Sequence, residues 1–317
     1  MKFITLKSLT PYFFGYNQTF GEGNYFARSA KFPQQTMILG MIRREILLQA
    51  GLLKRYKQNE WVDKKDYQKA RELVGRGKFS FIRKEDDNRI APKIELGKIK
   101  SISPVFICEG DDAVFEIPCV KEIKTDPLSV NFNYKEGVWG RYYNSNAAKS
   151  IRESEIFREI DLTHNNKKKR EDSFFKQICY KLNDGFKFGF FMECDFELQN
   201  SVVRLGADGG SFYMNVVESD KNFDDIDIIS PIKSEEKLSL IIGDSYVDLK
   251  CDFAITKEYT FKTIKHYGPR KGKKTFYKSR EVYLYEKGSL IVNDKTDYSH
   301  FGQKIGFNIS KIIKEAK

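Results

Sequence analysis

The chain has 317 residues, of which 40% are hydrophobic and 31% are charged, and its mean hydropathy is -0.53. This composition is typical of a folded, water-soluble protein that is long enough for two domains. Basic residues give it a net charge of +11 and a pI near 9.2, which favours a polyanionic partner such as nucleic acid. The basic runs lie among Gly, Pro and Thr rather than in an amphipathic helix, so no membrane partner is expected.

The five cysteines are widely spaced and include no C-x-x-C pair, so the sequence predicts neither a disulfide framework nor a metal site. The first 14 residues alternate like a strand and are interrupted by Lys2 and Lys7, which excludes a signal-peptide core. No phosphate-binding fingerprint occurs, and no cofactor is expected. We therefore expect a cytoplasmic protein in a reducing compartment.

The first half of the chain is predicted to contain one long helix among strands. A strand ends near Pro11, a glycine-rich loop covers residues 15–31, and apolar residues at helical spacing predict a helix over 36–48 with Thr36 as its N-cap. A charged and helical stretch is expected over 54–74. Further strands are predicted at 78–83, 98–108 and 113–118, with a turn at 109–112 before the last of them. This order of elements suits a ferredoxin-like half.

Residues 126–151 are polar and lack sustained periodicity, so they are interpreted as an extended insertion at the boundary between two domains, 1–150 and 151–317. The second half is predicted to be rich in strands, with an acidic loop over 220–236 and a terminal helix. The expected strands are 157–162, 173–182, 185–198, 212–217, 250–256, 281–285 and 290–292, a short apolar segment covers 238–242, and the helix covers 310–316. The predicted fold class is α+β.

The densest basic segment is Lys262–Arg280, which contains no carboxylate. Aromatic residues at Tyr267, Phe276 and Tyr277 lie among its charges, and such faces stack on the bases of single-stranded RNA. The candidate RNA-binding residues here are Lys265, His266, Arg270, Lys271, Lys273 and Lys274. A solvated hairpin without a ligand is the alternative, but we favour nucleic acid because the acids are absent.

Three weaker groups complete the candidate RNA-binding set, and each has a plain structural alternative. Lys167, Lys168, Lys169 and Arg170 form a basic loop between two strands that is equally well explained as a charged turn. Arg204, Gly206, Gly209 and Gly210 belong to a glycine-rich turn that would let a phosphate approach the backbone, or is simply tight. Thr36, Gly40, Arg43 and Arg44 lie near one face of the first helix, where Gly40 would admit either RNA or a packed element.

The sequence offers no convincing catalytic set. Its three histidines, His164, His266 and His300, are isolated from partner motifs. His266 could act as a general base on an RNA 2′-hydroxyl, yet a histidine among lysines is more often a phosphate contact. No catalytic residue is predicted, and we do not expect an enzyme.

The motifs at the N-terminus resemble those of subunit three of the Cmr complex, the type III-B CRISPR effector. They are Thr10-Pro11-Tyr12-Phe13-Phe14, Phe20-Gly21, and Phe32-Pro33-Gln34-Gln35-Thr36 followed by Gly40 and Arg43. Later segments follow in the order of that family: Ser103–Phe106, Glu109–Asp111, Phe115–Pro118, Glu155–Ile160, Ser173–Phe175, Arg204–Gly210, Gly288–Leu290 and Phe301-Gly302. The segment before the helix has fewer prolines than is usual, and Gly288 lacks a preceding Pro-Ala, so a sister subunit of another type III complex stays open.

This resemblance implies tandem ferredoxin-like (RRM-like) domains of the RAMP superfamily, with antiparallel sheets and long insertions. It implies a non-catalytic subunit that holds the 5′ tag of the CRISPR RNA. The implied partners are that RNA, the large polymerase-like subunit, the backbone RAMP subunits and, indirectly, target RNA. Two alternatives stay open: a CRISPR RNA processing endonuclease of the same superfamily that uses His266 or His164, and a stand-alone RNA-binding factor.

Overall fold

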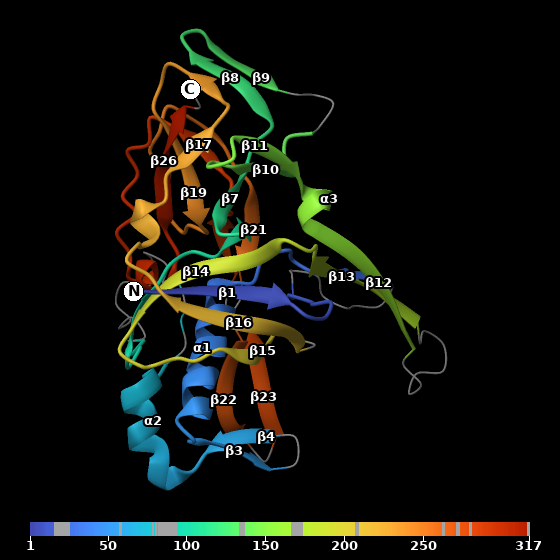
Figure 1. Ribbon diagram of the computed structural model, residues 1–317, viewed down its shortest axis with the longest axis vertical. Coiled ribbons are helices and arrows are strands. Elements are labelled where there is room, and N and C mark those ends of the chain that lie inside the picture. Colours follow the sequence, from blue (N-terminus) through green and yellow to red (C-terminus); the bar gives the residue numbers. More distant parts are fainter. Residues whose placement is uncertain are drawn as a thin grey trace.

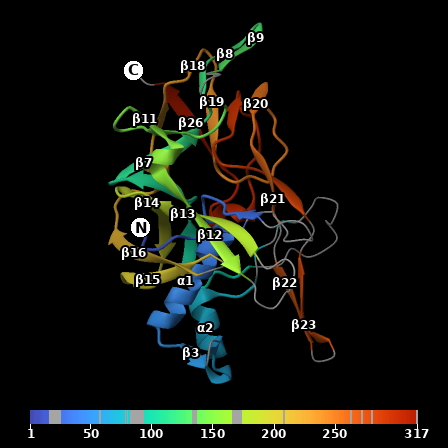
Figure 2. The same cartoon turned by 90° about the vertical axis from the view of Figure 1, so that its right-hand side faces the viewer.

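The computed structural model describes most of the chain, which forms a strand-rich α+β protein (Figures 1 and 2). The described residues are 1–15, 26–56, 59–77, 79, 81, 94–132, 137–165, 174–206, 209–261, 264–270, 273–278 and 281–315. The helices in these ranges are α1 (Gln35–Gln49), α2 (Tyr67–Val74) and the short α3 (Glu153–Ile156), with 3-10 turns at Lys64–Asp66, Phe223–Asp225 and Phe301–Ile305.

The largest sheet in the described residues, here called the central sheet, has the order β11-β10-β7-β6-β14-β1-β16-β15, and β5 also pairs with β14. Every pairing in it is antiparallel. Its strands are β1 (Lys2–Ser8), β5 (Ile99–Ile102), β6 (Phe106–Glu109), β7 (Asp112–Ile117), β10 (Arg141–Asn144), β11 (Lys149–Arg152), β14 (Phe186–Cys194), β15 (Ser201–Leu205) and β16 (Gly210–Glu218). The expected α+β class with mainly antiparallel sheets is confirmed.

A second sheet, here called the C-terminal sheet, has the order β17-β26-β19-β25-β20. Its strands are β17 (Ile228–Ser230), β19 (Leu238–Gly243), β20 (Phe253–Ile255), β25 (Leu290–Val292) and β26 (Ile309–Glu315). Smaller sheets are formed by β2 (Phe26–Arg28), β12 (Phe157–Asn165) and β13 (Phe174–Leu182), and by β8 (Val120–Thr125), β9 (Leu128–Phe132) and β18 (Lys233–Ser234). Three hairpin-like pairs complete the set: β3 (Leu53–Tyr56) with β4 (Asn59–Val62), β21 (Glu258–Phe261) with β24 (Val282–Tyr285), and β22 (Ile264–Arg270) with β23 (Lys273–Lys278).

The two faces of the central sheet bury two hydrophobic cores. Alternation along β1 sends Ile4 and Leu6 into a core that also contains Ile38 and Ile42 of α1. Phe3, on the opposite face, packs against a second core with Leu240 and Leu290 of the C-terminal sheet. Figure 1 accordingly shows α1 and α2 on one side of β1, β14, β15 and β16, and β17, β19 and β26 on the other.

The prediction of an extended insertion over 126–151 was wrong, because β10 and β11 lie in the central sheet. Tyr142 is buried in the first core and Tyr143 in the second, so adjacent residues of β10 are both apolar and buried. A strand covered on both faces lacks the alternation of a half-exposed strand, which explains the missed signal. The predicted division at residue 150 falls inside β11, and the central sheet takes strands from both sides of it. The ferredoxin-like assignment of each part stays a prediction.

Two predicted helical segments are strands instead. Residues 310–316 were expected to form a helix, but Ile309–Glu315 is β26, which pairs with β17 and β19. The stretch 54–74 begins with the β3–β4 hairpin, and only α2 is helical in it apart from a 3-10 turn. Sheet pairing outweighed the local helical preference in both segments. The strand expected at 78–83 lies mostly outside the described residues.

Candidate nucleic-acid interface

The long helix α1 begins one residue earlier than predicted, at Gln35, and its N-cap is Gln34 rather than Thr36. No side chain caps this end; the Gln35 amide instead donates to the carbonyl oxygens of Ser103 and Ile305, each at 2.9 Å. The buried amide thus joins the start of α1 to two segments that are distant in sequence. Thr36 is partly exposed.

The two arginines predicted to contact phosphate on α1 both have partners within the chain. Arg43 donates to the carbonyl oxygens of Gly77 at 2.9 Å and Glu95 at 2.6 Å, and burial lowers the pKa of its guanidinium. Arg44 forms a two-bonded pair with Glu60 at 2.8 and 2.9 Å, whose hydrogen bond raises the pKa of Arg44. A phosphate at Arg44 would therefore have to displace Glu60.

Gly40 differs from these arginines because it is exposed, and a Cβ added there would meet no atom within 4 Å. Close packing against another described element therefore does not explain this glycine inside a helix. Its predicted role as a close-approach point for RNA stays a prediction.

The glycine-rich turn joins β15 to β16 and packs against the segment that follows β1. A Cβ at Gly206 would lie 2.5 Å from the carbonyl oxygen of Phe13, and one at Gly210 would lie 2.8 Å from Tyr12 Cβ. Ser211 N donates to the Thr10 hydroxyl at 2.9 Å. The close approach that Gly206 and Gly210 permit is thus made by this chain itself.

Gly209 and Arg204 have more open surroundings on the same turn. Gly209 has a positive φ of 66°, and the nearest atom to an added Cβ is Arg204 Cδ at 3.7 Å. The Arg204 side chain is exposed at the end of β15. These two residues, rather than Gly206 and Gly210, leave the predicted phosphate site accessible.

The remaining basic candidates lie on two hairpins. Lys167, Lys168, Lys169 and Arg170 fall in the connection between β12 and β13, as expected, but outside the described residues. In the β22–β23 hairpin, Lys265 is opposite Tyr277 and His266 is opposite Phe276, so basic and aromatic positions face each other across the ladder. Arg270 is opposite Lys273, Lys274 follows on β23, and Lys271 lies outside the described residues. Figure 2 shows this hairpin apart from the central sheet.

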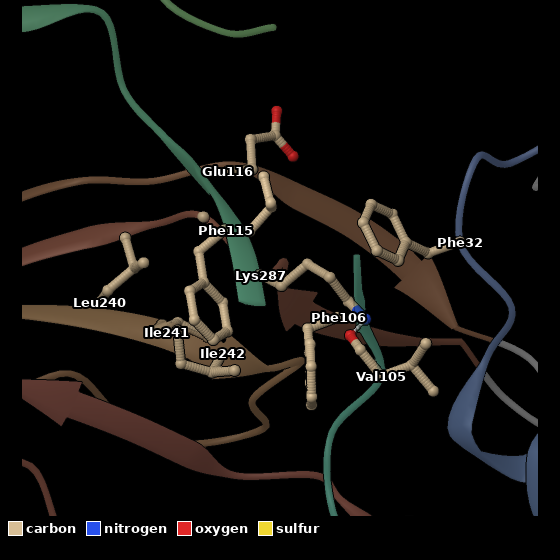
Figure 3. Close-up of a pocket in the computed structure, with 11 residues that line it drawn as sticks. Phe32, Val105, Phe106, Phe115, Glu116, Leu240, Ile241, Ile242 and Lys287 are labelled. Carbon is tan, nitrogen blue, oxygen red and sulfur yellow. Dashed lines mark hydrogen bonds between the residues drawn. The ribbon is translucent and has the colours of Figure 1, made fainter. Parts of the chain in front are cut away.

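A cluster of buried charges escaped the sequence analysis because its members are far apart in the chain. Lys257 Nζ lies 3.1 Å from Glu116 Oε2 and 3.6 Å from Glu286 Oε2. Lys287 Nζ donates to the Val105 carbonyl at 3.2 Å and lies 4.6 Å from the Phe32 ring centroid (Figure 3). Burial raises the pKa of the Glu286 carboxyl to about 7. The cavity beside these residues has a volume of about 10 Å³, which is too small for a ligand.

A polar groove of about 690 Å³ lies where β10, β11 and α3 meet, and it is large enough for a small ligand. Its lining includes Trp139 together with two arginines and two glutamates, Arg141, Arg152, Glu153 and Glu155. This balance of charge does not select a polyanion.

No group of His, Cys, Asp and Glu that could hold a metal ion occurs within the described ranges. His300 Nδ1 accepts a hydrogen bond from Gly302 N at 3.0 Å, and burial lowers the pKa of its imidazole. The side chains of His164 and His266 lie outside the described part. None of the helices in that part is long and apolar enough to cross a membrane.

Comparison with known proteins identifies one family. Residues 4–118 match the family model of the CRISPR-associated protein Cas_Cmr3. No curated protein matches the chain. Two similar solved chains belong to the type III-B Cmr-beta bound to cognate target RNA, one with AMPPnP in state 1 at 11% identity and one without it at 12%; each has a TM-score of 0.47 over 92% of this chain and 86% of that one. A third, from the Csm3-Csm4 subcomplex of the type III-A CRISPR-Cas interference complex, has 12% identity and a TM-score of 0.42 over 93% of each chain.

The family model covers β1, α1 and the β6–β7 hairpin, which include the motifs from Thr10 to Arg43 and from Ser103 to Pro118. The family match over residues 4–118 confirms the resemblance that these motifs carry: this part of the chain is that of a Cas_Cmr3 CRISPR-associated protein.

Proposed function

We propose that the chain is a non-catalytic RNA-binding subunit of a type III CRISPR effector complex. In this proposal it holds the 5′ tag of the CRISPR RNA and contacts the large polymerase-like subunit and the backbone RAMP subunits. The family match over residues 4–118 is the observation that carries it. The net charge of +11 supports an RNA partner, since binding releases counterions from the phosphates.

The placement of basic residues gives this proposal a physical form. Arg204 lies exposed at the glycine-rich turn, and the β22–β23 hairpin carries basic and aromatic positions opposite each other. Phosphates would bind the cations, and unpaired bases would stack on aromatic faces. The non-catalytic part of the proposal rests on the family resemblance.

Affinity-tagged chain isolated from its native host is expected to bring down CRISPR RNA and further subunits, because the proposal makes it part of an assembly. RNA sequencing and mass spectrometry of the eluate measure both. An untagged strain gives the background. Recovery of the chain without either would favour the stand-alone RNA-binding factor.

The purified chain is expected to leave repeat RNA uncut with or without a divalent metal. Gel electrophoresis of end-labelled repeat RNA measures this, and the His266→Ala variant is the matched control. A defined product that disappears in this variant would establish the processing endonuclease instead, with His266 as its base.

A further inference from the structure

One face of the central sheet is only partly covered by the C-terminal sheet. Along β1, β15 and β16, the side chains that point away from α1 are those alternating with Leu6, Val203 and Met214. Near β14 this face is buried, and Phe3 packs on Phe191 with ring centroids 4.9 Å apart. Towards the edge strand β15 the same face is open to solvent (Figure 1).

The open part carries a tyrosine between two strands that present basic and apolar side chains. Tyr213 on β16 is opposite Lys7 on β1 and opposite Val202 on β15. Arg204, two residues after Val202, is opposite Ser211 and so lies diagonally from Tyr213, within reach of a long side chain. Tyr213 is 41% exposed and Val202 is 59% exposed. We call Lys7, Val202, Arg204 and Tyr213 the outer patch.

The cations of the outer patch differ from those of α1 in having no protein partner. Arg43 and Arg44 are held by carbonyl and carboxylate oxygens. Neither Lys7 nor Arg204 forms a hydrogen bond or ion pair with any residue of the described ranges. The outward positions of β1, β15 and β16 include no carboxylate: besides the patch they are Phe3, Thr5, Ser211, Asn215 and Val217. Two unpaired positive charges therefore flank an exposed aromatic ring.

We propose that the outer patch binds single-stranded RNA, with one base stacked on Tyr213 and the adjoining phosphates held by Lys7 and Arg204. The inference rests on the proposed function for its RNA partner and adds a site to it. Unpaired bases offer the flat faces that an exposed ring stacks on, and phosphates complement the two cations. Charge complementarity favours RNA here over a protein partner, which would equally cover Val202 but would not need two free cations on either side of the ring.

Binding of fluorescein-labelled poly(U) RNA to the purified full-length chain tests the site by fluorescence anisotropy across a salt series. Tyr213→Ala is expected to weaken binding roughly five- to a hundred-fold, since that is the effect of removing one stacked base contact. Tyr213→Phe keeps the ring and is expected to bind like the unchanged chain. The double variant Lys7→Gln and Arg204→Gln is expected to lower the salt slope by about 2, one for each lost phosphate contact.

The controls separate this inference from the proposed function. Tyr283→Ala removes a tyrosine on β24 that is 65% exposed and outside the patch, and it is expected to leave binding unchanged. If the unchanged chain binds no RNA, the proposed function fails along with the patch. If it binds and Tyr213→Ala binds equally well, only the patch is overturned. Loss of other subunits from Tyr213→Ala in a pull-down, with RNA affinity retained, would assign the patch to a protein partner instead.

Discussion

Replacing Glu116 with alanine is expected to lower the free energy of unfolding by about 3–5 kcal/mol, the range observed when one partner of a buried ion pair is removed. The Glu116 side chain is only 4% exposed, and its carboxylate lies 3.1 Å from the Lys257 ammonium group. Removing it leaves Lys257 with Glu286 at 3.6 Å as its remaining acidic partner. Chemical denaturation of the full chain, followed by circular dichroism, measures the loss.

The other charges of the cluster make this loss hard to offset. Lys257 is buried, yet the nearby carboxylates raise the net pKa of its ammonium group, so it stays charged after the substitution. Glu286 compensates poorly because burial raises the pKa of its own carboxyl to about 7. Lys287 adds a second buried ammonium group, whose pKa burial lowers.

A surface pair provides the control for Glu116→Ala. Glu122 lies 3.7 Å from Lys124 on the neighbouring strand β8, and both side chains are exposed. Glu122→Ala is therefore expected to cost less than about 0.5 kcal/mol. A loss below about 1 kcal/mol for Glu116→Ala would show that Lys257 reaches water or another acid, and that the cluster does not hold the two sheets together.

The elements that the sequence predicted well are those with local signals. The apolar spacing from Met37 to Leu48 predicted α1 to within about a turn at each end, and its end near Gly51 is explained by the positive φ of 68° there. The turn at 109–112 joins β6 to β7 as predicted. These features depend on residues close together in the chain, which is why a single sequence reveals them.

The features that the sequence did not predict depend on contacts between distant segments. Glu116 and Lys257 are brought together only when the central and C-terminal sheets pack, and neither residue lies in a recognisable motif. Tyr142 and Tyr143 of β10 look irregular until both faces of the central sheet are known to be covered. Tyr213 gains meaning from Lys7, which its strand pairs with across a gap of some two hundred residues.

The glycine-rich turn shows why a motif alone left two interpretations open. Its glycines were predicted to admit a phosphate, with a tight turn as the alternative. At Gly206 and Gly210 the space is filled by the backbone and side chains of Phe13 and Tyr12. At Gly209 it is open. One motif thus contains glycines with different physical reasons, which only the folded chain distinguishes.

Gly206→Ala is expected to lower the free energy of unfolding by about 2–5 kcal/mol, because backbone strain and overpacking each cost about 1–3 kcal/mol. Its φ is 91°, which alanine adopts poorly, and the new Cβ would lie 2.5 Å from the Phe13 carbonyl oxygen. Chemical denaturation of the full chain measures the loss.

Gly209→Ala is the matched control, three residues away in the same turn. Its φ of 66° also disfavours alanine, but the nearest atom to the new Cβ is the movable Arg204 Cδ at 3.7 Å. Only the conformational cost of about 1–2 kcal/mol remains. Equal losses in the two variants would mean that the backbone at Phe13 moves aside, and the turn would then owe its glycines to φ alone. A larger loss at Gly206 would show that the segment after β1 and the turn between β15 and β16 hold each other in place beside Arg204.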